Sequence, residues 1–122
     1  LLMNIIARHP DKEFIFTVSP IRHLKDGAHG NQLSKSTLLL ALDEVLAKFP
    51  ERCEYFPAYE IVLDELRDYR FYAPDMVHPS DQAVDYLWTR FAGFAVPASE
   101  LPDLEERRKE YLRSRHRPIN IR

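Results

Sequence analysis

Phe14-Ile15-Phe16-Thr17-Val18 gives the main indication of fold class in this chain. It is a short run of apolar and β-branched residues without strict alternation, a pattern typical of a strand buried on both faces of a parallel sheet. Ser19-Pro20 ends the run, and a polar loop follows over residues 22–31. We therefore expect a buried strand that opens into a polar loop at its carboxyl end.

The segment after that loop has helical spacing. Ser34 or Ser36 can cap a helix. Its apolar residues recur at i, i+4, i+7, i+8 and i+11 and form one stripe: Leu38, Leu42, Val45, Leu46 and Phe49. Residues 53–56 then predict a second short strand, with Cys53 buried in it. Strand, helix, strand is the order of a parallel α/β sheet with a right-handed crossover.

Helices are expected before and after this unit. Residues 1–7 predict a helix that stops before Pro10, and residues 59–66 predict a short helix. An aromatic and charged loop follows over residues 67–74.

Ser80 is a good N-cap for the next helix, which is expected to end at Gly93. Its apolar stripe is Val84, Leu87, Trp88 and Phe91, with Trp88 in the core. A highly charged helix is expected near the end of the chain. We therefore assign residues 1–97 to an α/β domain and residues 98–122 to a charged helical tail.

The bulk composition excludes some classes of function. The 122 residues carry a net charge of −2, which gives no electrostatic basis for binding nucleic acid or an anionic membrane. No apolar run approaches the roughly 20 residues that span a bilayer. A single cysteine, Cys53, excludes an intrachain disulfide and fits a reducing compartment such as the bacterial cytoplasm.

Asp75-Met76-Val77-His78-Pro79 carries the chemistry. The carboxylate stands three residues before the imidazole. At this spacing Asp75 can accept a hydrogen bond from His78 Nδ1 and fix the tautomer, which leaves Nε2 free to take a proton from a nucleophile. Asp75 lies between the second strand and the next helix, so we expect it at the same sheet edge as the loop after the first strand.

Several longer motifs occur in this chain. In order they are Thr17-Val18-Ser19-Pro20-Ile21-Arg22-His23-Leu24-Lys25-Asp26-Gly27, Asn31, Ser34-Lys35, Tyr55-Phe56-Pro57-Ala58-Tyr59-Glu60, Asp68-Tyr69-Arg70-Phe71-Tyr72 and Asp75-Met76-Val77-His78-Pro79. Together they resemble the C-terminal half of a GSCFA-domain protein, from about Phe14 to Phe91. The charged tail after Pro97 is not covered. The GSCFA family in turn resembles the SGNH (GDSL-like) esterases and lipases.

The resemblance implies a fold and two roles. The fold is α/β, the C-terminal part of the three-layer parallel-sheet (flavodoxin-like) architecture of SGNH hydrolases. The last sequence block of that superfamily is Asp-x-x-His, which implies that His78 is the general base and Asp75 its orienting partner in a Ser–His–Asp triad. The superfamily's nucleophile and oxyanion-hole blocks are absent, and Leu1 lies inside a predicted helix. We therefore expect a longer polypeptide to supply the serine. No cofactor is implied.

Ser19 is a poor substitute nucleophile, although it ends a strand. In a nucleophile elbow the backbone N–H after the serine helps to form the oxyanion hole. The next residue here is Pro20, which has no N–H. We expect Ser19 to shape its loop instead.

Arg22, His23 and Lys25 are the candidate substrate-binding residues, because their loop is expected at the sheet edge of His78. They suit an anionic or hydroxyl-rich group; a solvated loop is the plain alternative. His23 and His29 are conceivable metal ligands beside Asp75 and His78, but no tight ligand motif joins them, and no metal is assigned.

Two functions are consistent with these residues. The first is a fragment of a serine esterase or acyltransferase that acts on a small-molecule or carbohydrate ester. The second is a non-catalytic α/β module that binds a polar ligand or a protein through residues 22–25 and the charged tail. Because two strands cannot cover themselves, we also expect the chain to self-associate.

Overall fold

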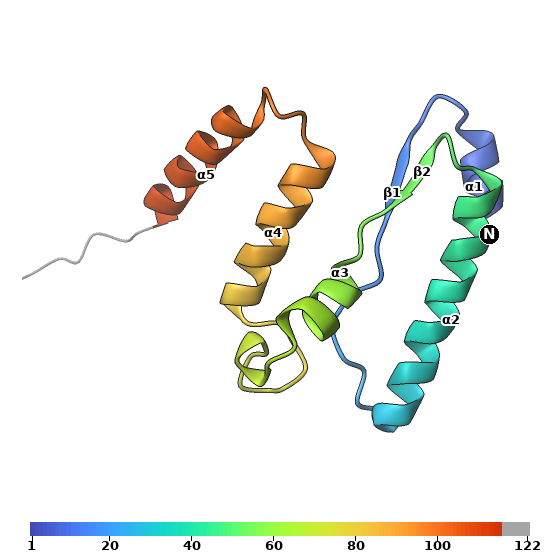
Figure 1. Ribbon diagram of the computed structural model, residues 1–122, viewed down its shortest axis with the longest axis horizontal. Coiled ribbons are helices and arrows are strands. Elements are labelled where there is room, and N and C mark those ends of the chain that lie inside the picture. Colours follow the sequence, from blue (N-terminus) through green and yellow to red (C-terminus); the bar gives the residue numbers. More distant parts are fainter. Residues whose placement is uncertain (116–122) are drawn as a thin grey trace, which may run out of the picture. The chain divides into compact units, whose positions relative to one another are not determined.

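The two predicted strands pair in parallel. In the computed structural model, which describes residues 1–115, β1 (Phe14–Phe16) lies beside β2 (Cys53–Tyr55) (Figure 1). Phe14 is opposite Cys53 and Phe16 is opposite Tyr55. Within the described residues the sheet has these two strands. The chain is thus mixed α/β and mostly helical, with a small parallel sheet.

The long helix between the strands supplies the core. α2 (Gly27–Lys48) places Val45 beside Ile6 and Cys53 in one buried cluster, and Leu42 beside Val18 and Tyr59 in another. Burying one such aliphatic side chain stabilises a fold by about 1.5–3 kcal/mol. The predicted stripe is confirmed at these two positions, and its members Leu46 and Phe49 are partly buried against the first cluster. It is wrong at its first residue, because Leu38 is exposed.

Two expectations about these elements are wrong. α2 begins at Gly27 and not near Ser34, because residues 28–31 are already helical and the positive φ of Gly27 turns the chain into the helix. Ser34 and Ser36 therefore lie inside α2. β1 is not buried on both faces, since Ile15 is 45% exposed and no layer of the described chain covers it.

α1 (Leu2–Arg8) ends before Pro10, as predicted. Its Ile6 is fully buried, and Arg52 holds the end of the helix through hydrogen bonds from Nη1 to the carbonyl of His9 (2.9 Å) and from Nη2 to that of Ile6 (3.2 Å). The N-terminal helix is thus tied to the segment that precedes β2.

Three short elements connect β2 to the next helix: α3 (Ala58–Glu60), the π-helix η1 (Ile61–Leu66) and the 3₁₀ helix η2 (Tyr69–Phe71). Arg67 ends η1 with φ 54°, and its N–H donates to the carbonyl of Val62 at 3.2 Å. Asp68 caps η2 by accepting from the N–H of Arg70 at 2.9 Å. The predicted short helix is present, with a wide last turn.

α4 (Asp81–Ala95) is capped as predicted, because Ser80 Oγ accepts from the N–H of Ala83 at 3.3 Å. It continues through Gly93 instead of ending there, and Trp88 is 39% exposed, so its assignment to the core is wrong.

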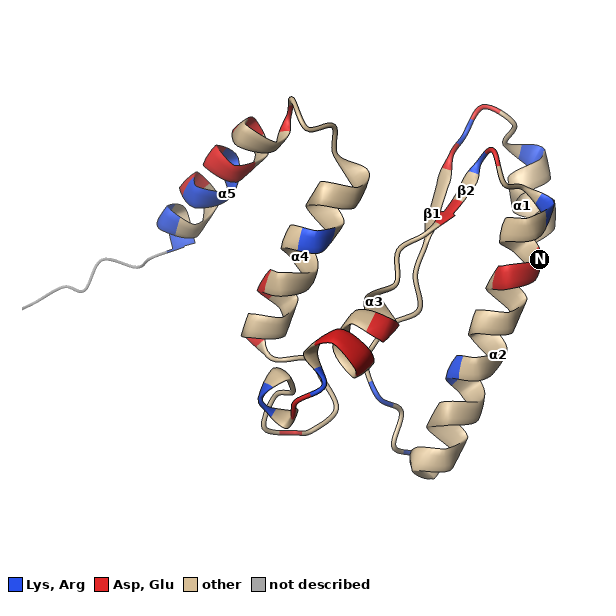
Figure 2. Cartoon of the chain, viewed as in Figure 1, with Lys and Arg blue, Asp and Glu red and all other residues tan. Residues whose placement is uncertain are grey.

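α5 (Leu101–Arg115) is the predicted charged helix; it has no buried residue and interleaves both signs of charge (Figure 2). The chain divides into a unit of residues 1–87 and a unit that begins at Trp88. No helix within residues 1–115 has the length and apolar character needed to cross a membrane.

Self-association follows from the surface of the first unit. Leu40 on α2 is 69% exposed, Leu33 and Leu38 are exposed near it in sequence, and the strands have open edges. We expect light scattering at micromolar concentration to show dimers or larger species. Leu40→Glu should shift the population toward monomer if α2 forms the contact, and Leu112→Glu should do so if α5 forms it. A well-folded monomer in the unsubstituted chain would contradict this expectation.

Candidate functional site

The loop that carries Asp75 and His78 is closed at its base. Tyr72 and Pro79 form an isolated antiparallel bridge, and the N–H of Ala73 donates to the carbonyl of His78 at 2.8 Å. Met76 sits at the tip with φ 60°, a left-handed conformation that reverses the chain there. These bonds hold residues 75–78 in a tight turn just before α4.

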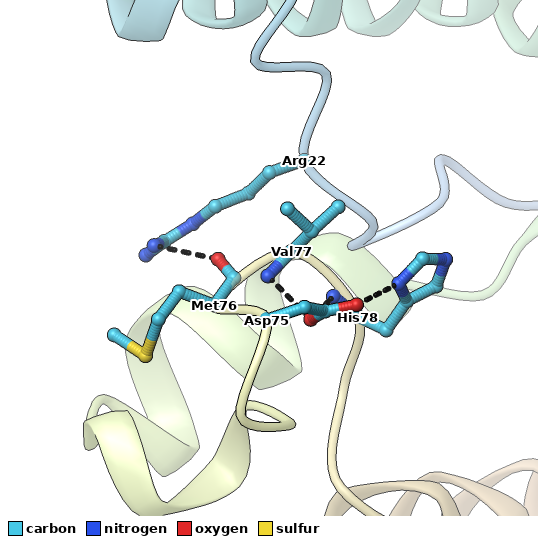
Figure 3. A network of polar contacts seen from close by, with 5 residues as sticks. All are labelled: Arg22, Asp75, Met76, Val77 and His78. Atoms are coloured by element: carbon cyan, nitrogen blue, oxygen red, sulfur yellow. Dashed lines mark hydrogen bonds and ion pairs between the residues drawn. The ribbon is translucent and has the colours of Figure 1, made fainter.

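Both oxygens of the Asp75 carboxylate are used. Oδ1 accepts the backbone N–H of Val77 at 2.9 Å and that of His78 at 3.0 Å, and Oδ2 lies 2.6 Å from His78 Nδ1 (Figure 3). The predicted side-chain contact is therefore present. The two side chains are 49% and 58% exposed, respectively, and the outer edge of the imidazole points away from the carboxylate (Figure 3). The catalytic role of the pair stays a prediction.

Hydrogen bonding keeps Asp75 ionised. The backbone N–H groups of His78 and Val77, followed by the His78 ring, lower the pKa of the Asp75 carboxyl to about 2. A carboxylate can only accept, so Nδ1 of a neutral His78 carries the proton and Nε2 has a free lone pair. The arrangement can orient an imidazole and can stabilise its protonated form.

Arg22 joins the two predicted loops. Its backbone N–H donates to the carbonyl of Val77 at 3.1 Å, and its Nη1 donates to that of Met76 at 3.4 Å (Figure 3). Its guanidinium also lies 4.0 Å from the centre of the Tyr72 ring, a cation–π contact worth about 0.5–1 kcal/mol at an exposed site. The expectation that both loops lie at one edge of the sheet is confirmed.

The other two candidate binding residues do not contact this loop by hydrogen bond or ion pair within residues 1–115. The backbone N–H of His23 donates to Asn31 Oδ1 at 2.8 Å, and the His23 side chain lines a separate depression along α2. Lys25 is exposed. Of the three residues, the structure thus brings Arg22 to the turn that carries Asp75 and His78, and the substrate-binding role of all three stays a prediction.

Lys35 has a buried position that its sequence pattern did not predict. It is 2% exposed, and its Nζ donates to the carbonyl of Ser19 at 2.6 Å, 6.0 Å from the centre of the Tyr59 ring. Burial lowers the pKa of its ammonium. Leu42 follows Lys35 at i+7, a spacing that places both on one helix face; this spacing was the available signal.

Ser19 shapes its loop through hydrogen bonds to both its side-chain hydroxyl and its backbone carbonyl. Its Oγ accepts the N–H of Ile21 at 3.2 Å, while its carbonyl accepts from Lys35. These contacts hold the start of the loop that leads to Arg22. Among the described residues, no cluster of three histidine, cysteine or acidic side chains is placed to hold a metal ion.

The low pKa of Asp75 predicts how its carboxyl titrates. Its folded value of about 2 lies below the ordinary 3.8, so its contacts stabilise the fold above pH 3.8 and are lost as the pH falls toward 2. Carbon NMR of the side-chain carboxyl should show a midpoint near that lower value. In His78→Ala both backbone donors remain, so we expect only part of the shift to disappear, and none in the control His29→Ala. A full return to 3.8 in His78→Ala would contradict this assignment of causes.

The sequence of the chain matches the model of one protein family. No curated protein sequence and no solved structure matches the chain. The model of the GSCFA family matches residues 1–91. The match contains the Arg22 loop, α2, both strands and the Asp75–His78 turn, and it begins earlier than the Phe14 expected from the motifs. The chain belongs to the GSCFA family.

Proposed function

We propose that this chain supplies the histidine and aspartate of a Ser–His–Asp triad in an SGNH-like esterase or acyltransferase. The single observation that carries the proposal is the 2.6 Å contact between Asp75 Oδ2 and His78 Nδ1. The parallel strands and the meeting of both loops at their carboxyl edge support it, because active sites in open α/β sheets form there. On this proposal the small sheet is the C-terminal part of a three-layer, flavodoxin-like fold.

The chemistry follows from the free nitrogen of His78. A serine outside residues 1–115 attacks the carbonyl carbon of an ester, and His78 Nε2 takes the hydroxyl proton. The imidazolium is stabilised by Asp75, which is already ionised. His78 then gives the proton to the leaving alcohol, and water or a second alcohol resolves the acyl-enzyme. The substrate class is a small-molecule or carbohydrate ester, and no cofactor takes part.

Ser19 does not serve as this nucleophile. Pro20 cannot provide the backbone N–H of an oxyanion hole, and the Ser19 hydroxyl and carbonyl are both engaged in holding the loop. On this proposal the nucleophilic serine is supplied by another segment of a longer polypeptide.

One observation favours the alternative of a non-catalytic binding module. Asp75 Oδ1 accepts two backbone N–H groups, so the carboxylate also closes a turn. On this alternative the Asp75–His78 pair is structural, and the Arg22 loop with the charged α5 provides the binding surface.

Kinetics of the longer polypeptide that carries the serine separate the two functions. His78→Ala should lower kcat for short-chain p-nitrophenyl esters by about 10²- to 10⁴-fold, because the base is lost. Asp75→Asn should also lower kcat while the turn is kept, since an amide oxygen still accepts both N–H groups. His29→Ala is the matched control and should leave the rate unchanged.

The chain of 122 residues alone should show no turnover above background. Turnover by this chain that disappears in Ser19→Ala would contradict the assignment of the nucleophile. Unchanged kcat in both His78→Ala and Asp75→Asn would favour the binding module.

A further inference from the structure

A small pocket lies beside the Arg22 contact to the Asp75–His78 turn. Its volume is about 150 Å³, and its polar lining is Arg22, Arg67, Asp68, Tyr69 and Tyr72, with aliphatic side chains of η1 completing the wall. A cavity of roughly 150 Å³ holds a group of benzene size. The pocket therefore suits one functional group of a larger molecule.

The two arginines carry unused hydrogen-bond donors. A guanidinium has five N–H donors, and the Arg22 guanidinium makes one hydrogen bond, to Met76, with its charge stacked over Tyr72. Within residues 1–115, the Arg67 side chain has no hydrogen bond or ion pair. Two cations thus line one pocket, and neither charge is neutralised there by an ion pair.

The carboxylate in the pocket does not cancel them. Asp68 accepts the backbone N–H of Arg70 at 2.9 Å and lies 3.7 Å from Arg70 Nε, so it is engaged by its own turn. The side chains that line the pocket therefore leave a net positive charge. A guanidinium offers paired donors that match carboxylate and phosphate oxygens.

Two further features indicate that a ligand group is accommodated. The Tyr72 hydroxyl is buried and has no hydrogen-bond partner among the described residues. Buried polar groups are nearly always satisfied, and a phenol hydroxyl donates readily to an anion. Arg67 is held at φ 54°, a costly conformation for a long side chain, of the kind that clusters at ligand sites.

We propose that this pocket binds a small oxyanion, a carboxylate or phosphate group, through Arg22, Arg67 and the Tyr72 hydroxyl. The assignment of this group to the substrate rests on the proposed function. Arg22 lines the pocket and also donates hydrogen bonds to the carbonyls of Met76 and Val77. An ester with an anionic group remote from its carbonyl would then be held beside His78.

Binding is tested on the whole chain with inorganic phosphate and with acetate. Millimolar phosphate should raise the melting temperature of the unsubstituted chain and of the control Arg8→Gln by equal amounts, because Arg8 is exposed on α1 and does not line the pocket. Arg67→Gln removes one charge in the same way and should abolish the shift. An equal shift in all variants means an adventitious ion only, and it overturns the proposal, as does no shift with either anion.

Tyr72→Phe distinguishes a ligand contact from a structural role. Loss of an unsatisfied buried hydroxyl should leave the melting temperature without phosphate equal or higher, while phosphate affinity falls about tenfold, as expected for a lost hydrogen bond to a charged group. A lower melting temperature with unchanged phosphate affinity would overturn the role of this hydroxyl.

Activity distinguishes free phosphate from a substrate-borne group. The serine-containing polypeptide should prefer a monosuccinate ester to the matching butyrate ester, and Arg67→Gln should remove this preference mainly through KM. His78→Ala should lose turnover but keep the phosphate shift. If the phosphate shift depends on Arg67 but no ester is hydrolysed, the anion site stands and the substrate assignment is overturned together with the proposed function.

Discussion

The parallel pairing of β1 with β2 is the constraint on which the candidate site depends. Parallel neighbours deliver their carboxyl ends to one edge of a sheet, so the chain leaves Phe16 and Tyr55 on the same side. The bonds from Arg22 to Met76 and Val77 become possible only because both segments start from that edge. An antiparallel pair would send the two loops to opposite ends.

The loop after β1 is held in place by a buried charge. Burying an ammonium is unfavourable unless it is hydrogen-bonded, and Lys35 meets this condition through the Ser19 carbonyl and the face of Tyr59. The same helix face contributes Leu42 to the core. The position of the Arg22 loop is therefore set by the packing of α2 and not by the loop alone. Removal of the Lys35 ammonium would leave the Ser19 carbonyl without this donor.

Local patterns were sufficient for much of the fold. Pro10 and Ser80 mark helix ends through backbone geometry and side-chain capping, which are properties of neighbouring residues, and both were predicted. The Asp75–His78 contact is equally local, since the partners are at positions i and i+3. The start of α2 was missed because it depends on the turn at Gly27 and on the Asn31 side chain, which reaches back to His23.

Local sequence patterns did not predict the features that depend on contacts between residues far apart in the sequence. The exposure of Leu38 and Trp88 reflects which faces find a partner, whereas periodicity shows only that a face is apolar. The left-handed Arg67 has no composition signal, because glycine or asparagine would be expected there. The pocket it lines is assembled from η1, η2 and the β1 loop, and so it becomes visible only in three dimensions.

The two carboxylate oxygens of Asp75 have different roles, one in the fold and one in the proposed chemistry. Oδ1 closes the turn by accepting from Val77 and His78, a task that an asparagine oxygen could perform equally well. Oδ2 accepts from the imidazole, and an amide nitrogen in its place could only donate. A turn by itself has no use for the second acceptor or for a permanent negative charge. An oriented imidazole that becomes positive during proton transfer needs both, and this difference is the physical reason to favour the catalytic function over a purely structural one.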